Sequence, residues 1–264
     1  MPTEFLTDAQ EQAYGHFVGP PSNQQLAAYF HLDDADRELV NMRRGDHNKL
    51  GFALQLTTAR FLSTFLIQPT AVPPTVVAYV AAQLGIHDVT CLAEYGARSN
   101  TAWEHAAEIR RVYGYREFSD PFVWFPLVRW LYTRAWLSAE QPSVLFDLAT
   151  AWLVERQVLL PGVSVLARLV ARIRERANAR FYRKLAVLPS SEQRDRLTAL
   201  LVVPAGSRRS LLDRLRRGPT QPNAIGLIDA LRRLELLRQD EWPDFAEAEP
   251  LPPNVVRFCP RSRH

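Results

Sequence analysis

Residues 164–184 read SVLARLVARIRERANARFYRK, and this stretch decides the fold class. Its apolar side chains recur at three- and four-residue steps, the period of an amphipathic α-helix. They are Leu166, Leu169, Val170, Ile173, Ala177, Phe181 and, just beyond the stretch, Leu185. The same period recurs along most of the chain, with no convincing alternation of β-branched residues. The sequence therefore predicts an all-α protein of about a dozen short helices, with no sheet of note.

Capping residues divide this pattern into separate helices. Side-chain oxygens that can accept hydrogen bonds from first-turn amides predict helix starts at Asp33, Asp46, Asn100, Ser119, Ser164, Ser190 or Ser191, and Asn223. A left-handed closing residue is expected at Gly45, Gly85, Gly114 and Gly218.

Charge and proline content divide the chain into three parts. The net charge of +4 is the sum of −5 over residues 1–150, +10 over 151–240 and −1 over the last 24. Combined with proline-bearing interruptions, this predicts a first helical domain at 1–140, a strongly basic second domain at 141–240 and a proline-rich, linker-like tail at 241–264. Such asymmetry is typical of a chain that binds a polyanion with one region.

Motifs and composition exclude several function classes. The chain has no glycine-rich phosphate loop, no Gly-x-Ser-x-Gly elbow and no zinc-ligand spacing. Cys91 and Cys259 lie far apart, which is typical of a reducing cytosol and suggests neither a disulfide nor a thiolate metal site. No signal peptide opens the chain, and no apolar run reaches the ~18 residues of a membrane helix. We therefore predict a cytoplasmic, non-catalytic chain without a cofactor, a metal or membrane contact.

Three further clusters are interpreted structurally. Asp33, Asp34 and Asp36 suggest a metal site, but they open a helix, where acidic residues favour the helix dipole. His105 and Glu108 form a lone His-x-x-Glu pair, expected on an exposed helix face. The aromatic stretch at 122–136 has the spacing of a buried helical core, and the alternative is a platform on which bases stack.

The first candidate interface is the turn at residues 43–49, RRGDHNK. Gly45 makes a turn between two helices, and the next helix has His47, Asn48 and Lys49 in its first turn. Free amides at a helix N-terminus bind phosphate, and Arg43, Arg44 and Lys49 add positive charge. The alternative for His47 is a satisfied boundary histidine on the face of Leu50 and Leu54.

The second candidate interface is a cationic row on the quoted helix. Only Glu175 relieves its charge, so intrahelical salt bridges cannot neutralise the row, and like charges at i,i+4 favour an external anion. A solvated face is the alternative. The row comprises Arg168, Arg172, Arg176, Arg180 and Lys184, with Arg174 and Arg183 further round the helix.

The third candidate is a pair of short helices at 192–201 and 208–217, compatible with a helix-turn-helix whose second helix presents arginines. The leucines of the second helix are expected to face inward. The outward arginines are Arg208, Arg209, Arg214, Arg216 and Arg217, and Arg232 with Arg233 extends this basic surface.

Residues 43–56, RRGDHNKLGFALQL, resemble the N-terminal region of transposases from replicative class II (Tn-three type) transposons. Further resemblance lies in LTD at 6–8, LAAYF at 26–30, VAYVAAQLGI at 77–86 and EHAAEIR at 104–110. It continues through LP at 160–161 and RFYR at 180–183 to SRRS at 207–210, and so covers most of the chain to about residue 240. From about residue 255 the sequence no longer resembles the family, which indicates a truncated or frameshifted copy or a fragment.

The resemblance implies two helical domains that bind duplex DNA at the transposon's terminal inverted repeats, within the bacterial nucleoid. In such transposases the chemistry belongs to a separate acidic-triad, metal-dependent domain, so this chain is expected to recognise DNA without cleaving it. The competing hypothesis is a helical protein-interaction or regulatory module that binds itself or a full-length transposase. A stand-alone hydrolase is a third possibility, and it predicts metal-dependent nicking.

Overall fold

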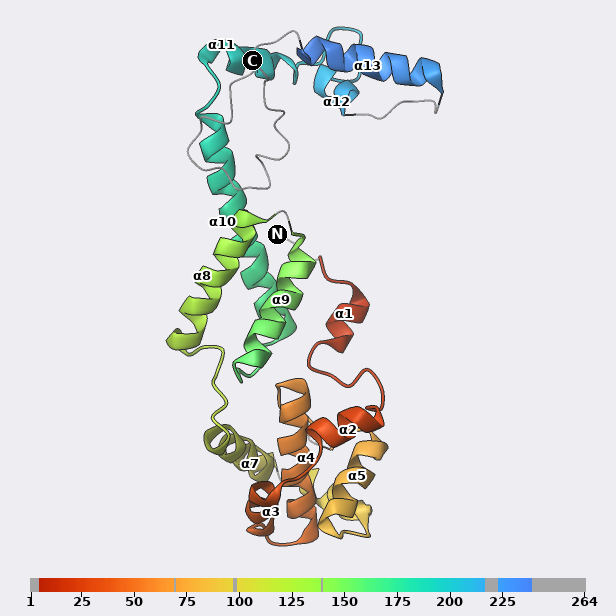
Figure 1. The fold of residues 1–264 in the computed structure, drawn as a ribbon, viewed down its shortest axis with the longest axis vertical. Coiled ribbons are helices and arrows are strands. Elements are labelled where there is room, and N and C mark those ends of the chain that lie inside the picture. Colours follow the sequence, from red (N-terminus) through yellow and green to blue (C-terminus); the bar gives the residue numbers. More distant parts are fainter. Residues whose placement is uncertain (1–4, 69, 97–98, 139, 217–222, 239–264) are drawn as a thin grey trace. The chain divides into compact units, whose positions relative to one another are not determined.

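The computed structural model describes residues 5–68, 70–96, 99–138, 140–216 and 223–238. Within these ranges it contains thirteen α-helices, and the only β-pairing is an isolated bridge between Arg116 and Val158. The predicted all-α fold is confirmed. The chain folds into two compact units (Figure 1): unit 1 comprises 1–135 and 140–174, and unit 2 comprises 136–139 and 175–264. The division at 174 falls inside a helix, and the predicted domain boundary near residue 140 stays a prediction.

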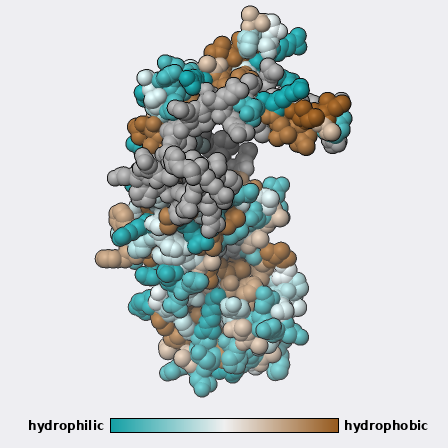
Figure 2. All heavy atoms as spheres, turned by 45° about the horizontal axis from the view of Figure 1, so that its top comes forward, coloured by the Kyte–Doolittle hydropathy of each residue, from teal (hydrophilic) through white to brown (hydrophobic). Residues whose placement is uncertain are grey.

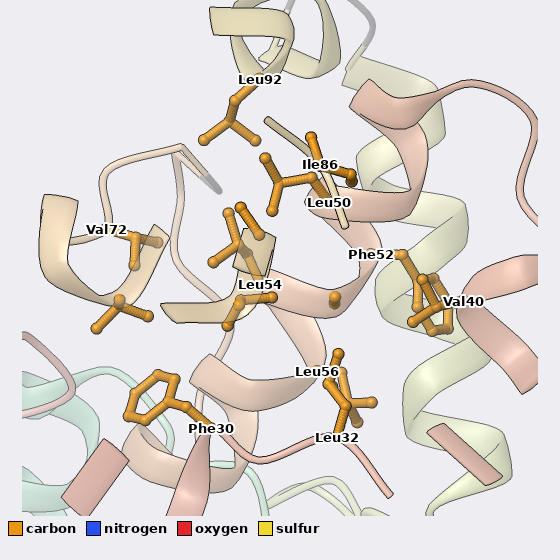
Figure 3. Packing of buried hydrophobic residues seen from close by; sticks show 14 of the residues in the cluster. Phe30, Leu32, Val40, Leu50, Phe52, Leu54, Leu56, Val72, Ile86 and Leu92 are labelled. Carbon is orange, nitrogen blue, oxygen red and sulfur yellow. The ribbon is translucent and has the colours of Figure 1, made fainter. Parts of the chain in front are cut away.

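The first part of unit 1 is built around one buried helix, α4 (Asp46–Leu62). Every residue from Leu50 to Ala59 is buried, because small and apolar side chains surround this helix on all sides. Figure 3 shows Leu50, Leu54 and Leu56 among the side chains of this core. The helices that pack against α4 are α2 (Asn23–Tyr29), α3 (Asp34–Asn41), α5 (Pro74–Leu84), α6 (Leu92–Gly96) and α7 (Ser99–Val112), with the 3-10 turn Val89–Cys91.

The structure confirms some of the predicted helix caps and corrects others. Caps are confirmed at Asp33 for α3, at Ser190 for α11 (Ser191–Ala199), at Asn223 for α13 (Ala224–Arg238) and at Gly85, which closes α5 with φ 67°. Four predicted starts are wrong by one or two residues. Gly45 rather than Asp46 is the N-cap of α4, Asp120 rather than Ser119 caps α8 (Pro121–Leu137), and Asn100 and Ser164 lie inside their helices. Gly218 lies outside the described residues.

The rest of unit 1 comprises α1 (Asp8–Ala13), one whole longer helix and parts of two others. These are α8, α9 (Pro142–Glu155) and the first half of α10 (Val163–Ala186). The buried side chains of α8 recur every fourth residue and are aliphatic: Val123, Leu127, Leu131 and Ala135. The buried side chains that α9 and α10 contribute are Leu145, Phe146, Ala149, Trp152, Leu153, Leu166, Ala167, Leu169, Val170 and Ile173.

The aromatic residues of α8 do not form the predicted core. Phe122 is 83% exposed and Phe125 is 64% exposed, while Trp124 and Trp130 are half-buried. The aliphatic row every fourth residue takes the buried face, so the aromatic residues between its members are turned to the flanks or to solvent. Arg129 and Arg134 of the same helix are exposed.

Unit 2 includes the end of α10, α11, α12 (Leu211–Leu215) and α13. The Leu212 amide donates to the Leu200 carbonyl at 2.9 Å, and α12 packs against α13. Several large apolar side chains remain exposed, and Figure 2 shows hydrophobic atoms gathered over α13. These residues are Leu201, Val202, Val203, Ile225, Leu227, Ile228 and Leu231.

The second helix of the predicted helix-turn-helix is shorter than expected. It begins at Leu211, capped by Ser210, and ends at Leu215, so Arg208 and Arg209 precede it. Leu211, Leu212 and Leu215 are half-buried, in agreement with their predicted inward direction.

Among the described residues, no single helix is both long and apolar enough to cross a membrane. One pair of consecutive helical segments, taken together, does meet these criteria of length and composition. It joins residues 74–84 to 89–95 with a bend of 112°.

Candidate nucleic-acid interface

The turn between α3 and α4 has a fixed backbone. Gly45 adopts φ 78°, a left-handed conformation, and a Cβ at this position would lie 2.9 Å from the His47 ring. The Asn48 side chain donates from Nδ2 to the Arg44 carbonyl at 2.9 Å. As predicted, His47, Asn48 and Lys49 occupy the first turn of α4. No described side chain caps this helix, and the Asn48 and Lys49 amides donate to the Gly45 carbonyl, so the Asp46 and His47 amides are the ones left for an outside acceptor.

Arg43 points back into the fold. Its Nη2 lies 2.6 Å from Oε1 of Glu108 on α7, and its guanidinium carbon lies 4.6 Å from the centre of the Phe52 ring. Only 17% of the Arg43 side chain is exposed, and its buried Nε has no partner in the described chain. Arg43 therefore ties the turn to α7, and its positive charge is already paired.

Behind Arg43 lies a buried polar group that links three helices. Gln55 of α4 donates to the Tyr95 hydroxyl at 2.6 Å, and this hydroxyl lies 3.0 Å from Nδ1 of His105 on α7. Burial, aided by the positive charge of Arg43, lowers the pKa of His105 to about 4. The predicted exposure of His105 is wrong: the residue is 6% exposed, because Tyr95 and Phe52 cover its ring.

The acidic cluster at the start of α3 is structural. Asp36 is buried, and it accepts hydrogen bonds at 2.5 Å from Arg60 Nη2 and from the Tyr113 hydroxyl. Burial opposes ionisation of Asp36, but these two donors hold its pKa below the usual value. Within the part of the chain that the structure describes, no group of three or more acidic, histidine or cysteine residues could hold a metal ion.

The remaining residues of the turn differ in their partners. His47 Nδ1 lies 3.4 Å from Oε2 of Glu94, so an acidic side chain already faces the imidazole. Arg44 is exposed and Lys49 is half-buried, and neither side chain has a hydrogen-bond or ion-pair partner among the described residues. Of the five predicted contacts in this turn, Arg44 and Lys49 are therefore the cations open to a phosphate.

The cations of α10 divide by their partners. Arg172 and Arg176 are exposed, and neither side chain has a hydrogen bond or an ion pair with any described residue. Arg168 and Arg183 donate from Nε to carbonyls of their own helix, at Ser164 and Ala179, so their charges remain uncompensated. Both are exposed. Uncompensated charge is therefore present on both halves of the helix.

The other basic residues of α10 have protein partners. The Arg180 guanidinium lies over the Trp136 ring, 4.9 Å from its centre, and Arg174 donates from Nη1 to the Ala135 carbonyl at 3.1 Å. Lys184 is half-buried and also interacts within the protein. Arg180 nevertheless remains exposed, so a second contact with an anion is sterically open.

In the third candidate, the predicted helix-turn-helix of unit 2, the arginines differ in whether they have a partner within the protein. Arg208 and Arg216 are exposed without a described partner, and Arg209 Nε lies 3.7 Å from Asp213 Oδ2. Arg217 and the side chains of Arg214 and Arg233 lie outside the described part, while Arg232 is exposed. Among the exposed cations that the predicted site does not include is Arg129 of α8, whose side chain has no partner in the described ranges. The lack of acidic residues in α8 is the sequence signal for it.

Comparison with known proteins places these features in a family. A family model described as a domain of unknown function (DUF4158) matches residues 5–173, which is more than half of the chain. The chain therefore belongs to this family. The matched segment ends one residue before the division of the two units within α10.

Curated relatives are transposases. The transposase for transposon gamma-delta of Escherichia coli (strain K12) is 51% identical over 243 residues, which are 92% of this chain and 24% of the relative. The transposase for transposon Tn501 of Pseudomonas aeruginosa is 31% identical over 250 residues, again 92% of this chain and 24% of the relative. The predicted resemblance to the N-terminal region of Tn-three type transposases is thus confirmed. The chain spans about a quarter of the length of these relatives.

Proposed function

We propose that this chain is a duplex-DNA recognition region that binds the terminal inverted repeats of a transposon, within the bacterial nucleoid. The observation that carries the proposal is the exposed, uncompensated charge of Arg168, Arg172 and Arg176 on α10. Like charges one helical turn apart destabilise a helix by a few tenths of a kcal/mol per pair unless an anion lies between them. The phosphates of duplex DNA supply such anions at regular spacing.

The proposal assigns different weights to the three regions. Arg172, Arg176, Arg168 and Arg183 supply phosphate contacts along α10, while Arg44, Lys49 and the open amides of α4 supply a local contact in unit 1. The predicted contacts of Arg43, His47 and Asn48 are the weakest part of the proposal, because each already has a partner in the protein. Arg208, Arg209, Arg214, Arg216 and Arg217 remain proposed contacts of unit 2.

The salt dependence of binding tests the proposal. The chain is titrated against a duplex carrying the terminal repeat of transposon gamma-delta and against a scrambled duplex, at several salt concentrations. Log affinity should fall steeply with log salt, and Arg172→Ala or Arg176→Ala should each lower the slope by about 1. Arg174→Ala is the matched control, because this arginine is half-buried and its guanidinium is directed at the Ala135 carbonyl of α8 rather than at solvent. Slopes unchanged in both variants would remove α10 from the interface.

We further propose that the chain does not cleave DNA. The polar clusters of the first part of unit 1 support this, because Asp36 and His105 are each held by protein partners rather than directed at a substrate. Supercoiled plasmid should remain intact after incubation with the protein and magnesium or manganese. Nicking that depends on the metal and co-purifies with the chain would contradict the proposal.

A second candidate function is a protein-interaction module that modulates a full-length transposase. The exposed apolar side chains of α13, among them Ile225 and Leu231, favour it, because soluble monomers rarely expose contiguous apolar patches. Gel filtration with and without DNA separates the two functions. A DNA-free dimer with no affinity for the repeat duplex would favour the interaction module.

A further inference from the structure

Two phenylalanine rings project from the start of α8. Phe122 is 83% exposed and Phe125 is 64% exposed, and they lie three residues apart on adjoining positions of one helical face. The Trp124 ring packs edge-on against Phe125, with ring centres 5.1 Å apart and planes at 84°. Trp124 and Phe125 thus form one ring pair, and Phe122 projects from the same helix three residues before Phe125.

The backbone beneath these rings is held firmly. Val123 and Leu127, which lie on the opposite face of the same turns, are fully buried. The helix start is capped, because Asp120 Oδ1 accepts a hydrogen bond from the Phe122 amide at 2.9 Å. The rings therefore need little further ordering of the main chain in order to enter a partner, which keeps the entropic cost of insertion low.

The positive charge of α8 near the rings favours contact with a polyanion. Helix α8 contains two arginines and no acidic residue. Arg134 pairs with Glu140, whereas Arg129, four residues beyond Phe125 on the same face, is exposed and has no partner in the described ranges. Of the acidic residues just before the helix, Glu117 forms an ion pair with Arg110, and Asp120 accepts a hydrogen bond from the Phe122 amide at the positive end of the helix dipole. An apolar group beside an uncompensated cation is the arrangement by which proteins insert side chains between base pairs while contacting the adjacent phosphates.

We propose that Phe122 and Phe125 form an apolar wedge that unstacks base pairs of the bound duplex, with Arg129 contacting a neighbouring phosphate. The wedge rests on the proposed DNA-binding function and adds deformation of the duplex to it. Opening a base step costs free energy, which additional protein interactions with the bent or opened duplex must offset. The wedge consequently favours sequences that unstack easily.

Fluorescence of 2-aminopurine tests the wedge. The base analogue is placed in turn at each adenine of the terminal-repeat duplex of transposon gamma-delta, and the full chain is added at saturating concentration. At one or two adjacent positions we expect a rise of roughly twofold or more, because unstacking relieves quenching of the analogue. The double variant Phe122→Ala/Phe125→Ala should lose this rise while keeping the salt slope of binding. Thermal unfolding should be unchanged, because both rings are exposed.

A matched control and two contrary outcomes make the test decisive. Trp103→Ala removes an aromatic side chain that is 73% exposed on α7, and it should leave the fluorescence rise intact. Tight, salt-dependent binding with no rise at any position would overturn the wedge and leave the proposed function standing. Absence of binding at every salt concentration would overturn the proposed function itself. If the double variant instead converts a DNA-free dimer into a monomer, this face is a protein interface and the wedge is wrong.

Discussion

The α3–α4 turn and the outer face of α10 are both rich in positive charge, yet the structure uses that charge differently. In the turn, Arg43 binds Glu108 and His47 faces Glu94. On α10, Arg172 and Arg176 are exposed without any such partner in the described chain. A cation that an acidic side chain already neutralises contributes to the fold, whereas an uncompensated row costs stability until an anion binds it. Similar sequence composition can therefore serve two different purposes.

The largest expected effect is on the turn. Arg43→Ala leaves the half-buried Glu108 carboxylate without its partner and removes the guanidinium from the Phe52 ring. We expect the free energy of unfolding to fall by about 3 kcal/mol, as measured by urea denaturation. The exposed Arg44→Ala should change it by less than about 0.5 kcal/mol. Equal stability of the two variants would mean that Arg43 is not structural.

A second prediction concerns the polar group behind the turn. The pKa of His105 is about 4 in the folded protein and near 6.5 when the residue is free, so the unfolded chain takes up a proton first as the pH falls. The free energy of unfolding should therefore be fully retained above pH 7 and should decrease between about pH 6.5 and pH 4, by at most about 3 kcal/mol. In His105→Gln this part of the pH dependence should disappear, whereas His87→Gln, at an exposed position, should keep it. A pH dependence that is identical in both variants would rule out the buried neutral histidine.

A third prediction concerns the two open cations of the turn. Arg44→Ala and Lys49→Ala should each lower the salt slope of DNA binding by up to about 1 without changing stability. Salt titrations of affinity beside urea denaturation would measure both quantities. If neither slope changes, α4 makes no phosphate contact and DNA binding belongs to the other regions.

The smallest expected effect concerns the stability contributed by Arg172 and Arg176, which contrasts most sharply with that of Arg43. In the absence of DNA and at low salt, Arg172→Ala/Arg176→Ala removes repulsion along α10, so the variant should be as stable as the parent or up to about 0.5 kcal/mol more stable. Urea denaturation at low salt would detect this difference. A loss of about 2 kcal/mol or more would show that these arginines, like Arg43, support the fold.

Periodicity predicted α10 to within two residues at each end, because a long amphipathic stripe is a local property of the sequence. The burial of His105 and the pairing of Arg43 could not be predicted in this way. Glu108 is 65 residues from Arg43, and only the packing of α7 on α4 brings them together. On α8 the aromatic and the aliphatic residues both recur with a helical period. The period alone does not decide whether the aromatic or the aliphatic side chains are buried.

The salt dependence of DNA affinity for the double variant Arg172→Ala/Arg176→Ala tests the central claim most directly. If the uncompensated face of α10 binds the phosphates of the terminal repeat, the slope of log affinity against log salt should fall by about 2 relative to the parent, while Arg174→Ala retains the parental slope. A double variant that binds the repeat with the parental slope would contradict the claim.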